Sequence, residues 1–190
     1  MGSKSIFSPS RRAIFVCYNR IMSRFRFSPI QDEMQMMKAI EHIHFACHAL
    51  CKQSMDRYLP VAGNIGIFCH YDNEYAYLKK LQEKLTDLSK SVYGKYFLLH
   101  KPIVIPAKGD IPTTTYSYLY IRKPDPNKDQ VGDIDFYLEP EKYVQFKQSL
   151  IEGKAVKDAR VLPNRPDLDL IELYDPEIDA LGYIGNKKWQ

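Results

Sequence analysis

Two segments of the chain follow the same pattern, and this internal similarity constrains the fold more than any other feature of the sequence. The first segment, from Ala62, reads AGNIGIFCHYDNEYAYLKKLQEKL, and the second, from Val131, reads VGDIDFYLEPEKYVQFKQSLIEG. Each has a glycine, a short polar residue and an alternating apolar run, followed by an acidic turn and a helical pattern. Because a missed repeat leads to a wrong fold, we interpret the two segments as the openings of two similar modules.

Two later segments extend the similarity. Residues 117–126 (SYLYIRKPDP) and 168–176 (LDLIELYDP) each read as a strand that ends at Asp-Pro. We therefore expect two βαβ(β) modules, at 61–126 and 131–176, with a short linker between them.

The two modules are expected to differ in their loops. Extra residues at 91–113 carry three prolines, which predict a short edge strand at 103–105 and then a loop. The C-terminal tail, 177–190, is expected to add a last short strand at 181–184 and then to fray.

A long amphipathic helix is predicted before the first module, at 32–58. Pro29 stops the preceding segment, Asp32 is a suitable N-cap, and Pro60 ends the helix. Apolar residues recur at helical spacing along one face of it. The predicted class is α+β: two βαβ(β) modules form a mostly antiparallel sheet with this helix packed against it. We expect a basic arm at 1–30 and a single domain at 31–190.

Paired modules of this kind resemble those of the vicinal oxygen chelate (glyoxalase-like) and tandem ferredoxin-like families. For the vicinal oxygen chelate family, the resemblance implies a small-ligand binder or a metal-dependent enzyme. Its site would lie between the two modules.

Basic residues gather in the first 30 positions. Six of the 27 Lys and Arg residues and none of the 23 Asp and Glu residues lie there, so the rest of the chain is slightly acidic. Three interpretations stay open: an organelle presequence, an arm that contacts phosphate or an acidic protein surface, and an element packed on the body. The arm's phosphate-binding candidates are Arg11, Arg12, Arg20, Arg24 and Arg26.

The composition is that of an ordinary soluble globular protein, with 45% hydrophobic and 26% charged residues. No apolar run is long enough to span a bilayer. The four cysteines lack a paired extracellular spacing, which favours reduced thiols and a cytoplasmic location, or an organelle if the arm is a presequence.

The predicted helix contains metal-ligand residue types at one-turn spacing. His44 and His48 are one turn apart, as are Cys47 and Cys51, and two ligands on one helix face suit zinc. The cysteines fall in the centre of the apolar face, where a free cysteine behaves as a small hydrophobic residue. We therefore favour a structural role over a zinc site.

The stretch VGDIDFYLEP contains an Asp-x-Asp pair on a predicted strand. Alternation places Asp133 and Asp135 on one face and the apolar residues on the other. The two modules can bring distant carboxylates together, so a divalent metal site is one hypothesis. The favoured alternative is a solvated face, or Asp135 paired with Arg122 or Arg160. The candidate metal ligands are His70, Asp133, Asp135 and Glu172.

The strand at 114–123 carries a row of tyrosines that ends in an arginine. On an open sheet such a row stacks bases and contacts phosphate. Tyrosine is also a favoured strand residue, and we give packing against neighbours more weight. The residues of this predicted face are Tyr116, Tyr118, Tyr120 and Arg122.

Three function hypotheses follow. The first is a non-catalytic binding or assembly module that uses the basic arm, and the tyrosine face, to contact nucleic acid or an acidic partner. The second is an enzyme or small-ligand binder with its site between the modules and with divalent metal as a candidate cofactor. The third is a structural subunit of a larger assembly. The acid-free arm puts the first slightly ahead.

Overall fold

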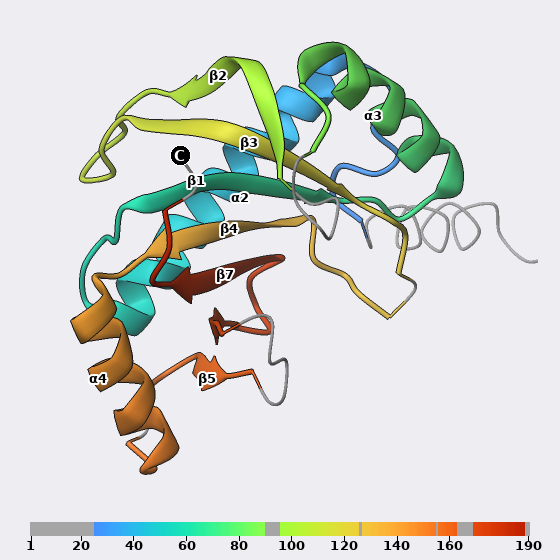
Figure 1. The fold of residues 1–190 in the computed structure, drawn as a ribbon. Coiled ribbons are helices and arrows are strands. Elements are labelled where there is room, and N and C mark those ends of the chain that lie inside the picture. The colour runs from blue at the N-terminus through green and yellow to red at the C-terminus, as the bar shows by residue number, and fades with distance from the viewer. Residues whose placement is uncertain (1–24, 90–95, 126, 155, 163–168, 189–190) are drawn as a thin grey trace, which may run out of the picture.

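The computed structural model describes residues 25–89, 96–125, 127–154, 156–162 and 169–188. Seven strands form one sheet in the order β2-β3-β1-β4-β7-β6-β5 (Figure 1). The strands are β1 Val61–Phe68, β2 Phe97–Ile105, β3 Thr114–Arg122, β4 Gly132–Tyr137, β5 Ala159–Val161, β6 Ile171–Leu173 and β7 Ala180–Gly185. The helices are α2 Glu33–Met55, α3 Asp72–Leu85 and α4 Pro140–Ile151.

The centre of the sheet is the antiparallel pair β1 and β4, the opening strands of the two similar segments. Each has a parallel neighbour on its outer side, β3 beside β1 and β7 beside β4. The remaining pairs, β2 with β3, β6 with β7 and β5 with β6, are antiparallel. The predicted α+β class, the mostly antiparallel sheet and the helix packed against it are confirmed.

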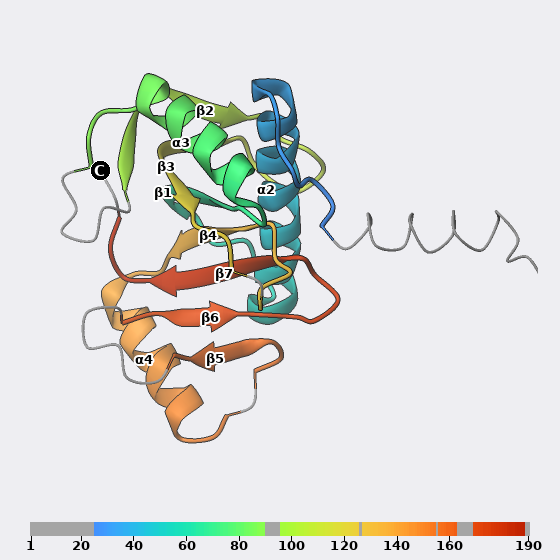
Figure 2. The ribbon, with the colours of Figure 1, turned by 90° about the vertical axis from the view of Figure 1, so that its right-hand side faces the viewer.

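Helix α2 runs along one face of the sheet, and Figure 2 shows it upright beside the stacked strands. Asp32 is its N-cap, and the side chain accepts a hydrogen bond from the Gln35 amide at 2.7 Å. The helix ends at Met55, three residues before the predicted end, where Asp56 takes a left-handed conformation. Its buried apolar side chains pack on β1, β4, β6 and β7.

The strand beside β4 differs from the expected match. The sequence comparison paired residues 168–176 with the strand now seen as β3, but β6 lies one position further out. The place beside β4 belongs to β7, which was expected only as a short tail strand. An Asp-Pro ending marks a turn and carries no information about the order of strands, which the packing of whole strands decides.

Residues 25–30 of the arm pack on the body. Ile30 is buried, and the Glu74 carboxylate accepts hydrogen bonds from the Ser28 hydroxyl at 2.8 Å and from the Ile30 amide at 2.9 Å. The same carboxylate accepts the His70 amide at 2.8 Å. Of the three interpretations of the arm, an element packed on the body is the one that agrees with residues 25–30.

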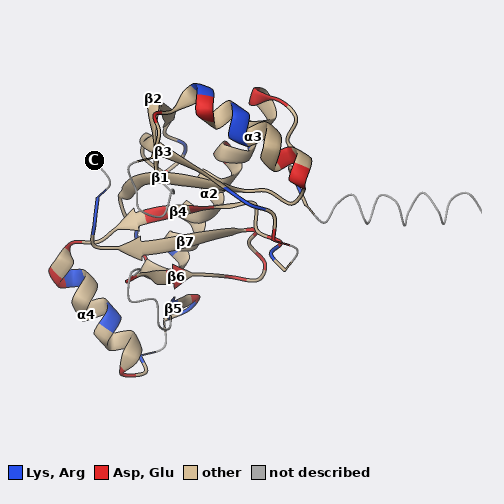
Figure 3. Ribbon diagram, turned by 45° about the vertical axis from the view of Figure 1, so that its right-hand side comes forward, with Lys and Arg blue, Asp and Glu red and all other residues tan. Residues whose placement is uncertain are grey.

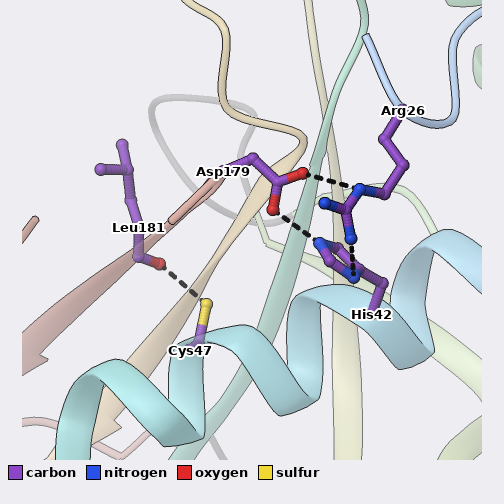
Figure 4. A network of polar contacts seen from close by, with 5 residues as sticks. All are labelled: Arg26, His42, Cys47, Asp179 and Leu181. Carbon is purple, nitrogen blue, oxygen red and sulfur yellow. Dashed lines mark hydrogen bonds and ion pairs between the residues drawn. The ribbon is translucent and has the colours of Figure 1, made fainter. Parts of the chain in front are cut away.

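A second contact holds this segment at α2 (Figure 4). The Arg26 Nε lies 3.2 Å from Asp179 Oδ2, and His42 Nε2 donates to Asp179 Oδ1 at 2.6 Å. The hydrogen bond from His42, with the charge of Arg26, holds the pKa of Asp179 below its usual value. No helix in the described part of the chain is long and apolar enough to cross a membrane.

Candidate ligand pocket

A polar cavity of about 490 Å³ opens on the sheet face opposite α2, where both halves of the sheet contribute side chains. Carboxylates, cationic side chains and tyrosines line the cavity. Figure 3 shows acidic positions on β4, at the middle of the sheet. The charged and phenolic lining residues are Asp133, Asp135, Glu172, Arg122, Lys128, Arg160, Tyr96, Tyr120 and Tyr183.

Strand alternation explains why β4 presents carboxylates to this cavity. Gly132 faces α2 so closely that a Cβ there would lie 2.4 Å from Ile43 Cδ1. Ile134 and Phe136 share that face and are fully buried. Asp133 and Asp135 therefore take the opposite face and line the cavity, as the sequence pattern predicts.

Asn64 of β1 and Asp135 of β4 make a cross-strand hydrogen bond. The Asn64 Nδ2 donates to Asp135 Oδ2 at 3.1 Å. Asn64 is only 4% exposed, and its Oδ1 has no hydrogen-bond partner among the residues that the structure describes. Since a carboxylate only accepts, the amide nitrogen must face Asp135, and the oxygen is left as an unused acceptor.

Glu172 of β6 is held by its neighbours. Arg160 of β5 contacts it through Nε at 2.5 Å and also through Nη2, and the Tyr183 hydroxyl donates to its Oε1 at 3.2 Å. Glu172 is 4% exposed, and the guanidinium of the exposed Arg160 side chain compensates its charge.

The three tyrosines are hydrogen-bond donors at neutral pH. Burial, and then the charges of nearby carboxylates, raise the pKa of Tyr96, Tyr120 and Tyr183 above the ordinary value. Asp133 contributes to the shift of all three. Their phenols therefore stay protonated and act as donors rather than as bases.

Cationic side chains lie on the same cavity. The Arg122 guanidinium carbon is 4.6 Å from the centre of the Phe68 ring, and one of its nitrogens is 3.5 Å from Asp125. Its side chain is 30% exposed, and Lys128 lines the cavity with it. Both carry positive charge that a ligand can reach.

The predicted tyrosine face is wrong at one position. Tyr116 is fully buried on the α2 side, where its hydroxyl lies 2.8 Å from His44 Nδ1. The burial alternation of β3 shifts by one residue between Tyr116 and Leu119, and the pairing of β2 with β3 is irregular there. Tyr120 and Arg122 consequently line the cavity without Tyr116. Tyr118 is opposite Asn64 in the register of β1 and β3.

The predicted metal ligands are brought together in part. Asp133, Asp135 and Glu172 line the cavity, but His70 does not. His70 stacks on Phe25 with ring centres 3.9 Å apart, and its Nδ1 lies 2.7 Å from the Ser28 hydroxyl. The described residues contain no group of three or more His, Cys, Asp or Glu side chains able to hold a metal ion.

Two histidines of α2, His44 and His48, and both of its cysteines lie in the core. Cys47 and Cys51 are buried free cysteines, and the Cys47 thiol donates to the Leu181 carbonyl at 3.1 Å (Figure 4). His48 Nδ1 donates to the His44 carbonyl at 2.8 Å. Burial raises the pKa of Cys51 to about 11 and lowers that of His44 to about 4. These values describe neutral side chains in a packed interior.

Of the predicted phosphate-contacting arginines, Arg26 is engaged by Asp179, while Arg11, Arg12, Arg20 and Arg24 lie outside the described residues. Sequence reasoning missed Asn64, Tyr96, Lys128 and Tyr183 as site residues. Asn64 carried a signal, because it occupies the position in the first segment that Asp133 occupies in the second.

Comparisons with known proteins give a fold and no function. No family model matches this chain, and no curated protein matches it. Among solved structures it is similar to a chain described as "Structural Genomics, Protein EC4020". The TM-score is 0.52 and the identity 17%, with 84% of this chain and 90% of that chain covered. At this identity the likeness shows a shared fold alone.

Proposed function

We propose that the protein binds a small polar molecule in the cavity between the two halves of its sheet. The observation that carries the proposal is the convergence there of carboxylates, tyrosines and cationic side chains from strands of both halves. The volume of about 490 Å³ is that of an ordinary small-molecule site, and convergent polar groups are what such sites use to orient a ligand.

Binding accounts for this lining better than covalent catalysis does. Among the described residues that line the cavity there is no serine, threonine, cysteine or histidine. A Ser-His or Cys-His nucleophile pair is therefore not part of this described lining, although its carboxylates and its lysine are of types that act as acids and bases in other sites. The raised pKa values of the tyrosines make them donors, which suits recognition.

The proposal is tested by screening a library of polar metabolites by NMR against the isotope-labelled protein. We expect ligands whose shift changes map to lining residues such as Asn64 and Tyr183. Leu162→Trp, which places a large ring in the cavity wall, should abolish their binding. The control is Leu88→Trp, at a position that is 85% exposed and lies outside the cavity lining. Hits that map elsewhere, or equal binding by both variants, would contradict the proposal.

The acid-free arm supports a second candidate function, contact with nucleic acid or an acidic protein surface. Four of its five candidate arginines are in residues 1–24, which lie outside the described residues. This candidate therefore depends on the charge distribution of the sequence.

A further inference from the structure

We infer that the cavity takes a zwitterion: a ligand with a cationic nitrogen head group at Asn64, Asp133 and Asp135, and an anionic group at Arg122 and Lys128. This inference rests on the proposed function, because it names the class of molecule that the same cavity binds.

The side-chain carbonyl oxygen of Asn64 is a buried hydrogen-bond acceptor without a donor among the described residues. The amide nitrogen of the same side chain is committed to Asp135. A buried acceptor without a hydrogen bond lowers stability, and a ligand N–H or O–H supplies the missing donor. The group in contact with Asn64 must therefore be a donor.

The charge beside Asn64 selects a cation among the donors. Asp133 and Asp135 project from the same face of β4, two residues apart. The charge of Asp133 acts on the phenols of Tyr96, Tyr120 and Tyr183, on three different parts of the wall. A head group with N–H donors and a positive charge can bond the Asn64 oxygen and also attract the charges of Asp133 and Asp135. A neutral hydroxyl can bond the oxygen but lacks the charge.

The tyrosine rings favour an organic cation over a metal ion. An aromatic wall attracts ammonium and guanidinium groups through its π face. The cavity is far larger than one ion, and the described residues offer no group of three His, Cys, Asp or Glu ligands for a metal. A planar guanidinium fits the floor best, because its five donors can serve Asn64 and both carboxylates at once.

The opposite charge lies on the same cavity. Glu172 is already compensated by Arg160, so that pair adds little net charge. Arg122, which also lies 3.5 Å from Asp125, and Lys128 carry the remaining positive charge on the cavity, and a carboxylate is the simplest group that pairs with both. A molecule that resembles a basic amino acid carries both kinds of charged group and so offers a partner to both sets of side chains.

Titration calorimetry with the full chain tests this on the unchanged protein, using arginine, agmatine, citrulline and glutarate as probes. We expect arginine to bind best. Agmatine, which lacks the carboxylate, should bind about tenfold more weakly, since one charge-assisted contact is lost. Citrulline has a neutral head of the same shape and should lose at least as much. Glutarate, which has no cation, should not bind.

Two variants locate the ends of the ligand. Asp133→Asn keeps the shape and should weaken arginine and agmatine alike by about tenfold or more. Lys128→Gln should bring arginine close to agmatine and leave agmatine unchanged. Asp110→Asn, at an exposed turn outside the cavity, is the control and should change neither.

The outcomes separate this inference from the proposed function. If citrulline or glutarate binds in the cavity as tightly as arginine does, the cationic head group at Asn64, Asp133 and Asp135 is wrong while small-ligand binding stands. If library ligands bind there and all four probes fail, the result is the same. If neither the library nor the probes bind in the cavity, both proposals are overturned.

Discussion

Gly66 and Asp133 lie opposite each other across the β1–β4 pair, and the carboxylate of Asp133 occupies the space that a side chain at Gly66 would need. A Cβ at Gly66 would be 2.0 Å from Asp133 Oδ1. The glycine therefore sets the position of an acidic group on the cavity floor.

We predict that Gly66→Ala displaces Asp133 and weakens the sheet. Overpacking of this kind costs about 1–3 kcal/mol, which urea unfolding will measure as a lower midpoint. Cavity ligands should also bind more weakly. Gly109→Ala is the control for adding a methyl group to open space, although its φ of 59° adds strain of its own. Unchanged stability and binding in Gly66→Ala would show that Asp133 moves aside without consequence.

Acid should destabilise the protein through His44. Burial, with the charge of His48 as a smaller cause, lowers the pKa of His44 from 6.5 to about 4. Between pH 6.5 and about pH 4, His44 is therefore protonated in the unfolded chain but neutral in the folded chain. The stability from this residue is complete above pH 6.5, falls as the pH drops from 6.5 to about 4, and changes no further below. The loss amounts to about 3 kcal/mol.

Urea unfolding at pH 7.5 and pH 4.5 checks this prediction. His44→Gln, which keeps an acceptor for the Tyr116 hydroxyl, should lose much less stability between the two pH values than the original chain. His100→Gln removes an exposed histidine that pairs with Asp87 and should leave the pH dependence as it was. An identical pH dependence in all three proteins would exclude His44 as its source.

Glu74 is predicted to hold the segment 25–30 on the body. Glu74→Gln replaces one carboxylate oxygen, and with it the acceptor for either the Ser28 and Ile30 donors or the His70 amide. We expect a loss of about 2–4 kcal/mol and faster tryptic cleavage after Arg26. Glu141→Gln, in the exposed first turn of α4, is the matched control and should change neither measurement.

The Arg160–Glu172 pair should show coupling in a double-mutant cycle. Arg160→Met leaves Glu172 buried without its cation, and we expect a loss of about 1–3 kcal/mol, reduced because the Arg160 side chain is 59% exposed. Adding Glu172→Gln should recover part of that loss. Lys101→Met, on the exposed edge strand β2, serves as the control. Additive effects in the cycle would mean that the pair does not stabilise the fold.

The basic arm is predicted to bind nucleic acid through residues 1–24. Single-stranded RNA of mixed sequence should bind at low salt and be released as the salt concentration rises. Deletion of residues 1–24 should abolish this binding, while the contacts of Arg26 and Ile30 with the body are retained. Binding that survives the deletion, or no binding at low salt, would remove nucleic acid as a partner.

Local signals in the sequence were enough for the helices, for the two central strands and for part of the site. Asp32 marked the start of α2, and alternation placed Asp133 and Asp135 together on one face of β4. The position of Tyr116 was not predictable, because the irregular pairing of β2 with β3 shifts its face. Asn64 and Tyr183 meet Asp135 and Glu172 only through the order of strands in the sheet. That order depends on contacts between distant segments, which no local pattern encodes.

The seam between β1 and β4 has a consequence for cooperativity. Asn64 lies on β1 and Asp135 on β4, so the lining of the cavity is complete only while these two strands are paired. A bound molecule would contact both strands, and its binding free energy would be added to the free energy needed to separate β1 from β4. Amide exchange in β1 and β4 should then slow together on saturation, and neither half expressed alone should recognise the ligand.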